Sequence, residues 1–99
     1  MFVHHVFFWL KEADNDEARA TLARELHQLK AIPQIEQHHV GTAAETRRPA
    51  IDHSYDFSLL LFFKDKAAHD AYQVHPIHEA FVQNCGKLWS KVRVYDSEA

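Results

Sequence analysis

The chain has 99 residues, a hydrophobic content of 46% and a formal net charge of −3 at pH 7. This length predicts one small domain, and the negative net charge makes nucleic acid an unexpected partner. The apolar start at residues 2–10 contains two histidines and has no basic region before it, so it predicts neither a signal peptide nor a membrane segment. Cys85 is the only cysteine and cannot form an intrachain disulfide, which favours the cytoplasm.

The first half of the chain predicts a strand, a helix and a second strand. Residues 3–11 alternate as a strand does, and both faces of this strand carry large apolar side chains. Asp14 is an N-cap candidate with Glu17 three residues on, which predicts a helix at about residues 15–31, ended by Pro33. Its apolar face consists of Ala18, Leu22, Leu26 and Leu29. A weaker pattern at residues 34–42 predicts the next strand.

The second half predicts a loop, a strand, an interrupted helical segment and a last strand. The predicted ranges are a loop at 43–54, a strand at 55–63, a helix at 65–73, further helical turns from Pro76 through Phe81 closed by Gly86, and a strand at 88–95. The resulting order, β-α-β-β-α-β, predicts an α+β fold of the ferredoxin-like kind, with a four-stranded antiparallel sheet and its helices on one face.

Such a sheet leaves one face without helices, and that face is normally polar. The strands at 3–11 and 55–63 are apolar on both faces, so something must cover the open face. A second copy of the same chain is the simplest cover. The sequence therefore predicts a homodimer that packs sheet against sheet.

One short segment, residues 72–78, concentrates chemistry around a proline. Tyr72, His75 and His78 can each donate or accept a proton or a hydrogen bond near neutral pH. On an unbroken helix Tyr72 and His78 would point well apart. Pro76 ends one helix and favours the start of another, so both side chains can face the same space.

The segments 3–8, 55–63 and 72–81 resemble the stress-responsive A/B barrel (Dabb) family, and the Tyr-x-x-His-Pro-x-His element is the most specific part of this likeness. The resemblance spans nearly the whole chain, so residues 1–99 are expected to form a single Dabb domain. It implies a dimeric α+β barrel, in agreement with the two-faced strands. One branch of the family resembles polyketide cyclases of the olivetolic acid cyclase type, which close a linear polyketide by aldol chemistry.

Carried over by position, that branch implies a catalytic group of His5, Tyr72 and His78. In this hypothesis His78 is the general base, Tyr72 donates to the developing oxyanion, and His5 orients His78 or the substrate. A cavity between sheet and helices would hold a small, apolar, polyketide-like or aromatic ligand. The residues expected to contact the ligand are Phe7, Trp9, His75 and Phe81. Two of these residues also have an architectural interpretation. His75 can cap the helix that starts at Pro76, and Phe81 can pack on the sheet.

Other interpretations stay open. The chain can be a non-catalytic stress-response or structural dimer, or a cofactor-free monooxygenase acting on an aromatic compound. A metal site would use the His-x-x-His spacing of His75 and His78, and further ligands could come from His4, His5, His38, His39 or His69. Pro76 disrupts that geometry and adjacent histidines on a strand point to opposite faces, so no metal or cofactor is expected. Cys85 as a nucleophile has no paired base nearby in the sequence. Whether the protein is an enzyme is left undecided.

Overall fold

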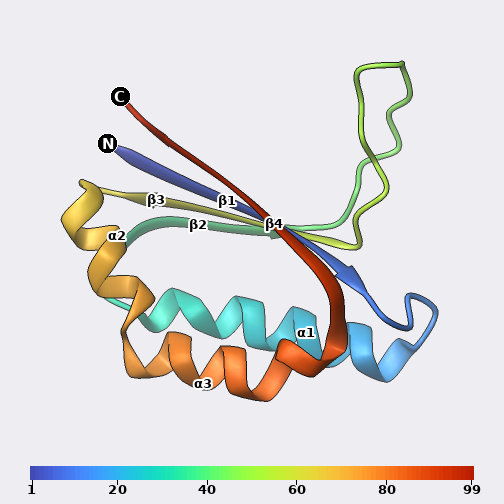
Figure 1. The fold of residues 1–99 in the computed structure, drawn as a ribbon, viewed down its shortest axis with the longest axis horizontal. Coiled ribbons are helices and arrows are strands. Elements are labelled where there is room, and N and C mark those ends of the chain that lie inside the picture. The colour runs from blue at the N-terminus through green and yellow to red at the C-terminus, as the bar shows by residue number, and fades with distance from the viewer.

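The computed structural model describes residues 1–99 as one sheet covered on one side by helices (Figure 1). The elements in chain order are β1 (Phe2–Leu10), α1 (Asp16–Gln28), the 3-10 turn η1 (Leu29–Ala31), β2 (Ile35–Gly41), β3 (Phe57–Phe63), α2 (Lys66–Gln73), α3 (Pro76–Cys85), the 3-10 turn η2 (Gly86–Leu88) and β4 (Trp89–Glu98). All neighbouring strands are antiparallel, in the order β2-β3-β1-β4. None of the helices is long and apolar enough to cross a membrane.

The predicted ferredoxin-like α+β fold is confirmed, with corrections to element boundaries. The helical turns after Pro76 form a full helix, α3, which extends past Phe81 to Cys85. Strand β4 continues beyond the predicted end at residue 95 to Glu98. This extension has a consequence for the site, because it brings Asp96 into the sheet.

Side-chain caps fix where each helix begins. The cap of α1 is Asn15, whose side chain accepts from the Ala18 N–H at 3.0 Å, so the prediction of Asp14 as the cap was one residue early. Asp65 caps α2 in the same way. His75 caps α3, with Pro76 at the first helical position, so the predicted break between two helices is confirmed.

The core lies between the helices and one face of the sheet. Strand β1 alternates strictly, with Phe2, His4, Val6, Phe8 and Leu10 buried toward the helices. From α1 and the segment after it, Leu22, Leu26, Leu29 and Ile32 are fully buried against this face. Of the predicted apolar helix face, residues 22, 26 and 29 therefore face the core, and Ala18 is half-buried.

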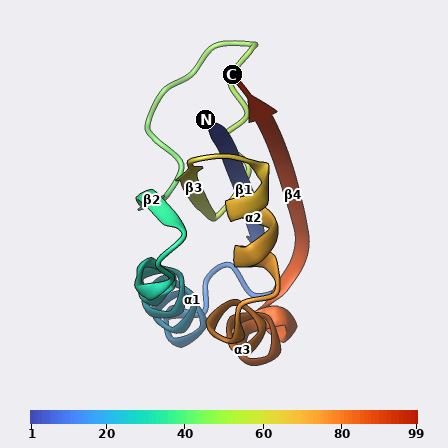
Figure 2. The same ribbon diagram turned by 90° about the vertical axis from the view of Figure 1, so that its left-hand side faces the viewer.

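The opposite face of the sheet has no helix on it (Figure 2). It carries the half-buried residues Val3, His5, Phe7 and Trp9 from β1. Leu60 pairs across the sheet with His5 on one side and His39 on the other, which places all three on this open face. On β4, Tyr95 is 61% exposed. This face therefore presents a broad, largely apolar and aromatic surface.

Candidate functional site

A cleft of about 180 Å³ lies between β1, β4 and the two helices of the Pro76 break. Its lining is His4, Val6, Phe8, Leu59, Tyr72, Gln73, His78, Phe81, Val82, Trp89, Val92 and Val94. Most of these side chains are apolar, and the few polar ones include a phenol and two imidazoles. This composition is typical of sites that bind small organic molecules.

The break at Pro76 brings Tyr72 and His78 together. Tyr72 lies at the end of α2 and His78 in the first turn of α3, and their ring centroids are 4.6 Å apart. The Tyr72 side chain is almost completely buried, at 1% exposure, whereas His78 is half-buried. Both residues line the cleft. The sequence prediction that these two side chains face the same space is therefore met by the geometry.

Burial gives these two groups complementary protonation states. It raises the pKa of Tyr72 well above the usual value of 10.0, so the phenol keeps its proton and can act only as a donor or neutral acceptor near pH 7. It lowers the pKa of His78 below the usual 6.5, so this imidazole is neutral near pH 7 and can accept a proton. A proton acceptor therefore stands beside a hydrogen-bond donor.

His4 is the second imidazole of the cleft. Its Nδ1 lies 2.6 Å from Oδ1 of Asp96, and its ring centroid is 5.8 Å from that of Tyr72. Because a carboxylate only accepts, Nδ1–H must donate to Asp96, which leaves Nε2 as an acceptor. Burial lowers the pKa of His4, and Asp96 opposes that shift. Asp96 thus fixes the ring in one tautomer.

The structure does not bring His5, Phe7 or Trp9 to this cleft, which corrects the expectation that they share a cavity with Tyr72 and His78. These three residues lie on the open face of the sheet, because neighbouring side chains on a strand point to opposite faces. A separate hollow of about 250 Å³ on that face is lined by Phe7, Trp9, Asp52, Tyr55, Lys91, Arg93 and Tyr95.

The other two predicted ligand contacts differ from each other. Phe81 lines the cleft, where its ring centroid is 5.7 Å from that of Trp89. His75 does not line it. The His75 Nδ1 accepts from the Ile77 N–H at 3.1 Å, so its side chain is engaged as the helix cap, as its architectural interpretation predicts.

Replacing His75 by alanine is expected to lower the free energy of unfolding by about 1 kcal/mol, because the first turn of α3 loses its side-chain acceptor. His75→Asn, which keeps an acceptor at the cap, should recover most of this loss. Urea denaturation of the three proteins measures the effect. Equal stability of His75→Ala and the wild-type protein would show that the cap contributes nothing.

Two alternative chemistries find little support in the geometry. The His75–His78 pair is not arranged as a two-histidine metal ligand set, since His75 Nδ1 accepts the cap hydrogen bond and the proton of the neutral ring is then on Nε2. Cys85 is fully buried, and burial raises the pKa of its thiol to about 11, so it is not an activated nucleophile.

Sequence reasoning missed Asp96, and it named His4 and His69 only as possible further ligands of a metal at His75 and His78. A signal for His69 was present, since it precedes Tyr72 by three residues and so shares its helix face. The place of Asp96 depends on its cross-strand pairing with His4, which no local pattern reveals.

Stability is expected to fall as the pH drops below about 6.5. His4, His5 and His78 all have pKa values lowered by burial in the folded protein. Between those values and about 6.5, the unfolded chain binds protons that the folded chain does not, so acid favours unfolding. Urea midpoints at about pH 7.5 and about pH 5.5 check the sign, and a higher midpoint at the acidic pH would contradict it.

Comparison with known proteins agrees with the fold. A Dabb family protein from Mesorhizobium loti with a ferredoxin-like fold is 27% identical over 99% of this chain and 95% of its own, with a TM-score of 0.82. A dimeric ferredoxin-like protein of unknown function from Thermobifida fusca is 19% identical over 99% of this chain and 90% of its own, with a TM-score of 0.79.

A hydroxynitrile lyase from Passiflora edulis is 17% identical over 97% of this chain and 90% of its own, with a TM-score of 0.77. No curated protein sequence matches the chain. The sequence profile of the stress responsive A/B barrel domain matches residues 2–99. The chain therefore belongs to the stress responsive A/B barrel domain (Dabb) family.

Proposed function

We propose that this protein binds a small, largely apolar carbonyl compound in the cleft and catalyses acid–base chemistry on it. The observation that carries the proposal is the pairing of a neutral imidazole, His78, with a buried, protonated phenol, Tyr72, at 4.6 Å between ring centroids. Aldol-type reactions need both kinds of group, a base for a carbon-bound proton and a donor for the oxygen that gains charge.

In the proposed step, His78 removes a proton from the carbon next to the carbonyl. The C–H bond breaks, its electron pair forms the enolate, and the negative charge collects on the former carbonyl oxygen, to which the Tyr72 hydroxyl donates a hydrogen bond. His4, held by Asp96, presents Nε2 as an acceptor for a hydroxyl group of the ligand. The carbon nucleophile is then ready to attack a second carbonyl, as in a cyclisation.

The size of the cleft limits the ligand. A volume of about 180 Å³ is below the ~300–1,000 Å³ typical of sites for drug-sized molecules. A compact aromatic or short polyketide-like carbonyl compound suits it better than a long chain. Phe81 and Trp89 would pack against the apolar part of such a ligand.

The likeness to a hydroxynitrile lyase supports the class of chemistry. That protein shares the fold at 17% identity, and its name indicates a lyase acting on hydroxynitriles. Carbon–carbon bond cleavage of that kind and aldol closure both need a positioned proton acceptor.

We also propose that the protein is located in the cytoplasm, because its buried free thiol, Cys85, suits a reducing compartment.

We further propose that the protein acts as a homodimer formed through the open face of the sheet. The half-buried Leu60 and Phe62 and the exposed Tyr95 lie on this face or its edge, where a monomer would leave them in water. Similar proteins from Thermobifida fusca and Bacteroides fragilis are dimeric. A dimer without acid–base activity would make the assembly itself the functional object.

Proton exchange tests the acid–base proposal without knowledge of the natural substrate. Small aryl ketones that carry a hydroxyl group, from which His4 can accept, and 1,3-diketones are incubated with the protein in D₂O, and NMR follows the loss of the signal from the protons next to the carbonyl. Acceleration above a matched imidazole buffer, abolished by unfolding the protein, supports the proposal. No acceleration for any compound that NMR shows to bind in the cleft would reject His78 as the base.

A further inference from the structure

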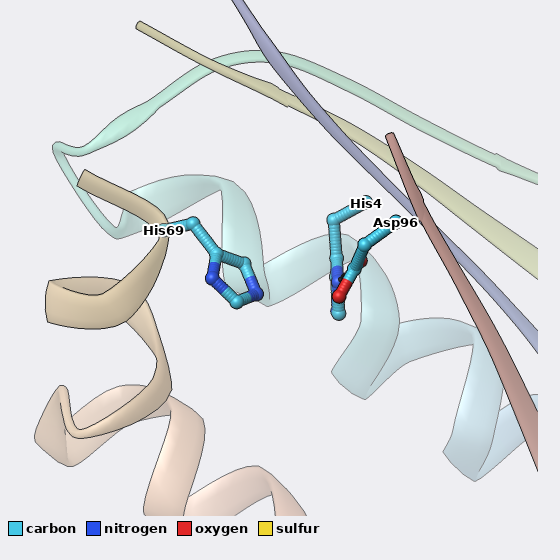
Figure 3. A group of neighbouring side chains, drawn as sticks. All are labelled: His4, His69 and Asp96. Carbon is cyan, nitrogen blue, oxygen red and sulfur yellow. Dashed lines mark hydrogen bonds and ion pairs between the residues drawn. The ribbon is translucent and has the colours of Figure 1, made fainter. Parts of the chain in front are cut away.

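Two histidines and a carboxylate from three different elements converge beside the cleft (Figure 3). His4 comes from β1, His69 from α2 and Asp96 from β4. Each offers one ligand atom, and these atoms all lie within 4.8 Å of one another. His4 and His69 are buried, whereas the side chain of Asp96 is 39% exposed. Packing therefore holds the two histidines in place, and solvent reaches the group at Asp96.

The donor set matches that of a divalent transition metal such as Zn²⁺. Imidazole nitrogen and carboxylate oxygen are common zinc ligands, and three protein ligands with an open fourth position are typical of sites that also bind water or a small molecule. A soft-ligand site would need cysteine or methionine, and an alkaline-earth site would need more oxygen ligands than Asp96 alone supplies.

The surroundings of His69 resemble the outer shell of a metal ligand. Its Nδ1 lies 3.1 Å from Oδ1 of Asp70, so the carboxylate accepts from Nδ1–H and leaves Nε2 with its lone pair. Figure 3 shows the His69 ring directed toward His4 and Asp96, with one of its two nitrogens on the side that faces them. Stacking on Phe2, with ring centroids 4.3 Å apart, holds this orientation. Gln73 Nε2 lies 3.1 Å from His69 Nε2 and donates to it.

We propose that His4, His69 and Asp96 form a binding site for a single divalent transition-metal ion of the zinc class. The proposal does not rest on the acid–base function, since it concerns binding alone and uses two residues, His69 and Asp96, that do not line the cleft. An ion held there would lie beside His4, with its open position toward the cleft.

Binding needs only small side-chain movements. Ligands about 2.0–2.1 Å from a tetrahedral ion lie about 3.3 Å from one another. The His4–Asp96 contact of 2.6 Å must therefore widen, and the more distant atoms of the group must approach. Asp96 can do this because it is partly exposed, and His69 Nε2 exchanges its contact with Gln73 for the ion. Each bound nitrogen is deprotonated: His69 already carries its proton on Nδ1, whereas in His4 the proton moves from Nδ1 to Nε2 when the ion binds.

Zinc titration by calorimetry tests the site, using chelator-treated protein without an affinity tag at about pH 7.5. One ion per chain is expected for the wild-type protein. Asp96→Asn and His69→Phe should each weaken the Kd by at least about 100-fold, since even outer-shell losses cost about 10–100-fold. Asp70→Asn should weaken it by about 10–100-fold. His53→Asn removes an exposed loop histidine and should leave the Kd unchanged.

Cobalt provides a second measurement. Co²⁺ added to the wild-type protein should give the intense visible absorption of a low-coordinate site, absent in Asp96→Asn. His69→Phe keeps a ring packed on Phe2, and Asp96→Asn changes a partly exposed side chain, so at least one of the two variants is expected to fold. Circular dichroism checks the fold of each variant. Zinc binding with the same Kd and stoichiometry in wild type and in a folded variant of either residue would overturn the proposal, as would no binding by the wild type.

Discussion

Replacing His78 by asparagine is expected to slow the exchange of carbonyl α-protons by about 10²–10⁴-fold, the usual contribution of a positioned general base. The side chain of His78 lines the cleft, and burial lowers its pKa, so the neutral base is the form present near pH 7. Asparagine keeps a polar side chain in the first turn of α3 but cannot accept the proton. NMR measures the exchange rate at saturating ligand.

Two comparisons isolate the role of His78. Tyr72→Phe keeps the ring in the core and removes only the hydroxyl, so it should slow exchange while leaving the free energy of unfolding close to that of the wild-type protein. His53→Asn, in the exposed loop, should exchange protons at the wild-type rate. Full exchange activity in a folded His78→Asn protein would eliminate His78 as the base.

Replacing Leu60 by lysine is expected to weaken the homodimer by about 100-fold or more in Kd. Leu60 lies on β3, one of the two central strands, and its cross-strand neighbours His5 and His39 place it on the open face. A charged side chain there would lose its water on association, and each dimer contains two copies of the change. Sedimentation at micromolar protein should give twice the 11.5 kDa of one chain for the wild type, and mainly monomer for the variant.

Leu60→Met keeps the apolar side chain and should remain dimeric. The fold of both variants can be compared by circular dichroism, because Leu60 is outside the buried core. A wild-type protein that sediments as a monomer at this concentration, or a lysine variant that dimerises as tightly as the methionine variant, would contradict an interface on the open face.

The fold was predictable because its signals are local. Proline and cap residues mark the helix ends, as Pro33 and Pro76 show, and the apolar run of β3 identifies a strand buried in the middle of a sheet. The errors are of one or a few residues, such as the cap at Asn15 in place of Asp14. The end of β4 was missed because residues 96–98 are polar and pair only through the partner strand β1.

The site was only half predictable. Tyr72 and His78 follow from the Pro76 break, a local feature. The choice between His4 and His5 does not, because both faces of β1 are apolar and the sequence does not reveal which one the helices cover. A shift of one residue moves a side chain to the other face of a sheet. The resemblance assigned the role to His5, which lies on the open face, one residue after the histidine that lines the cleft, His4. Asp96 needs the β1–β4 register, which is a property of the folded sheet.

The most direct test of the site is a comparison of His4→Phe with His5→Phe in the proton-exchange measurement. Both substitutions keep a ring and remove its nitrogens, but His4 faces Tyr72 in the cleft while His5 lies on the open face. The geometry predicts exchange slowed by at least about 10-fold in a folded His4→Phe protein, and wild-type exchange in a His5→Phe protein that remains dimeric. The reverse order, with His5→Phe impaired and His4→Phe unaffected, would contradict the assignment of the cleft as the functional site.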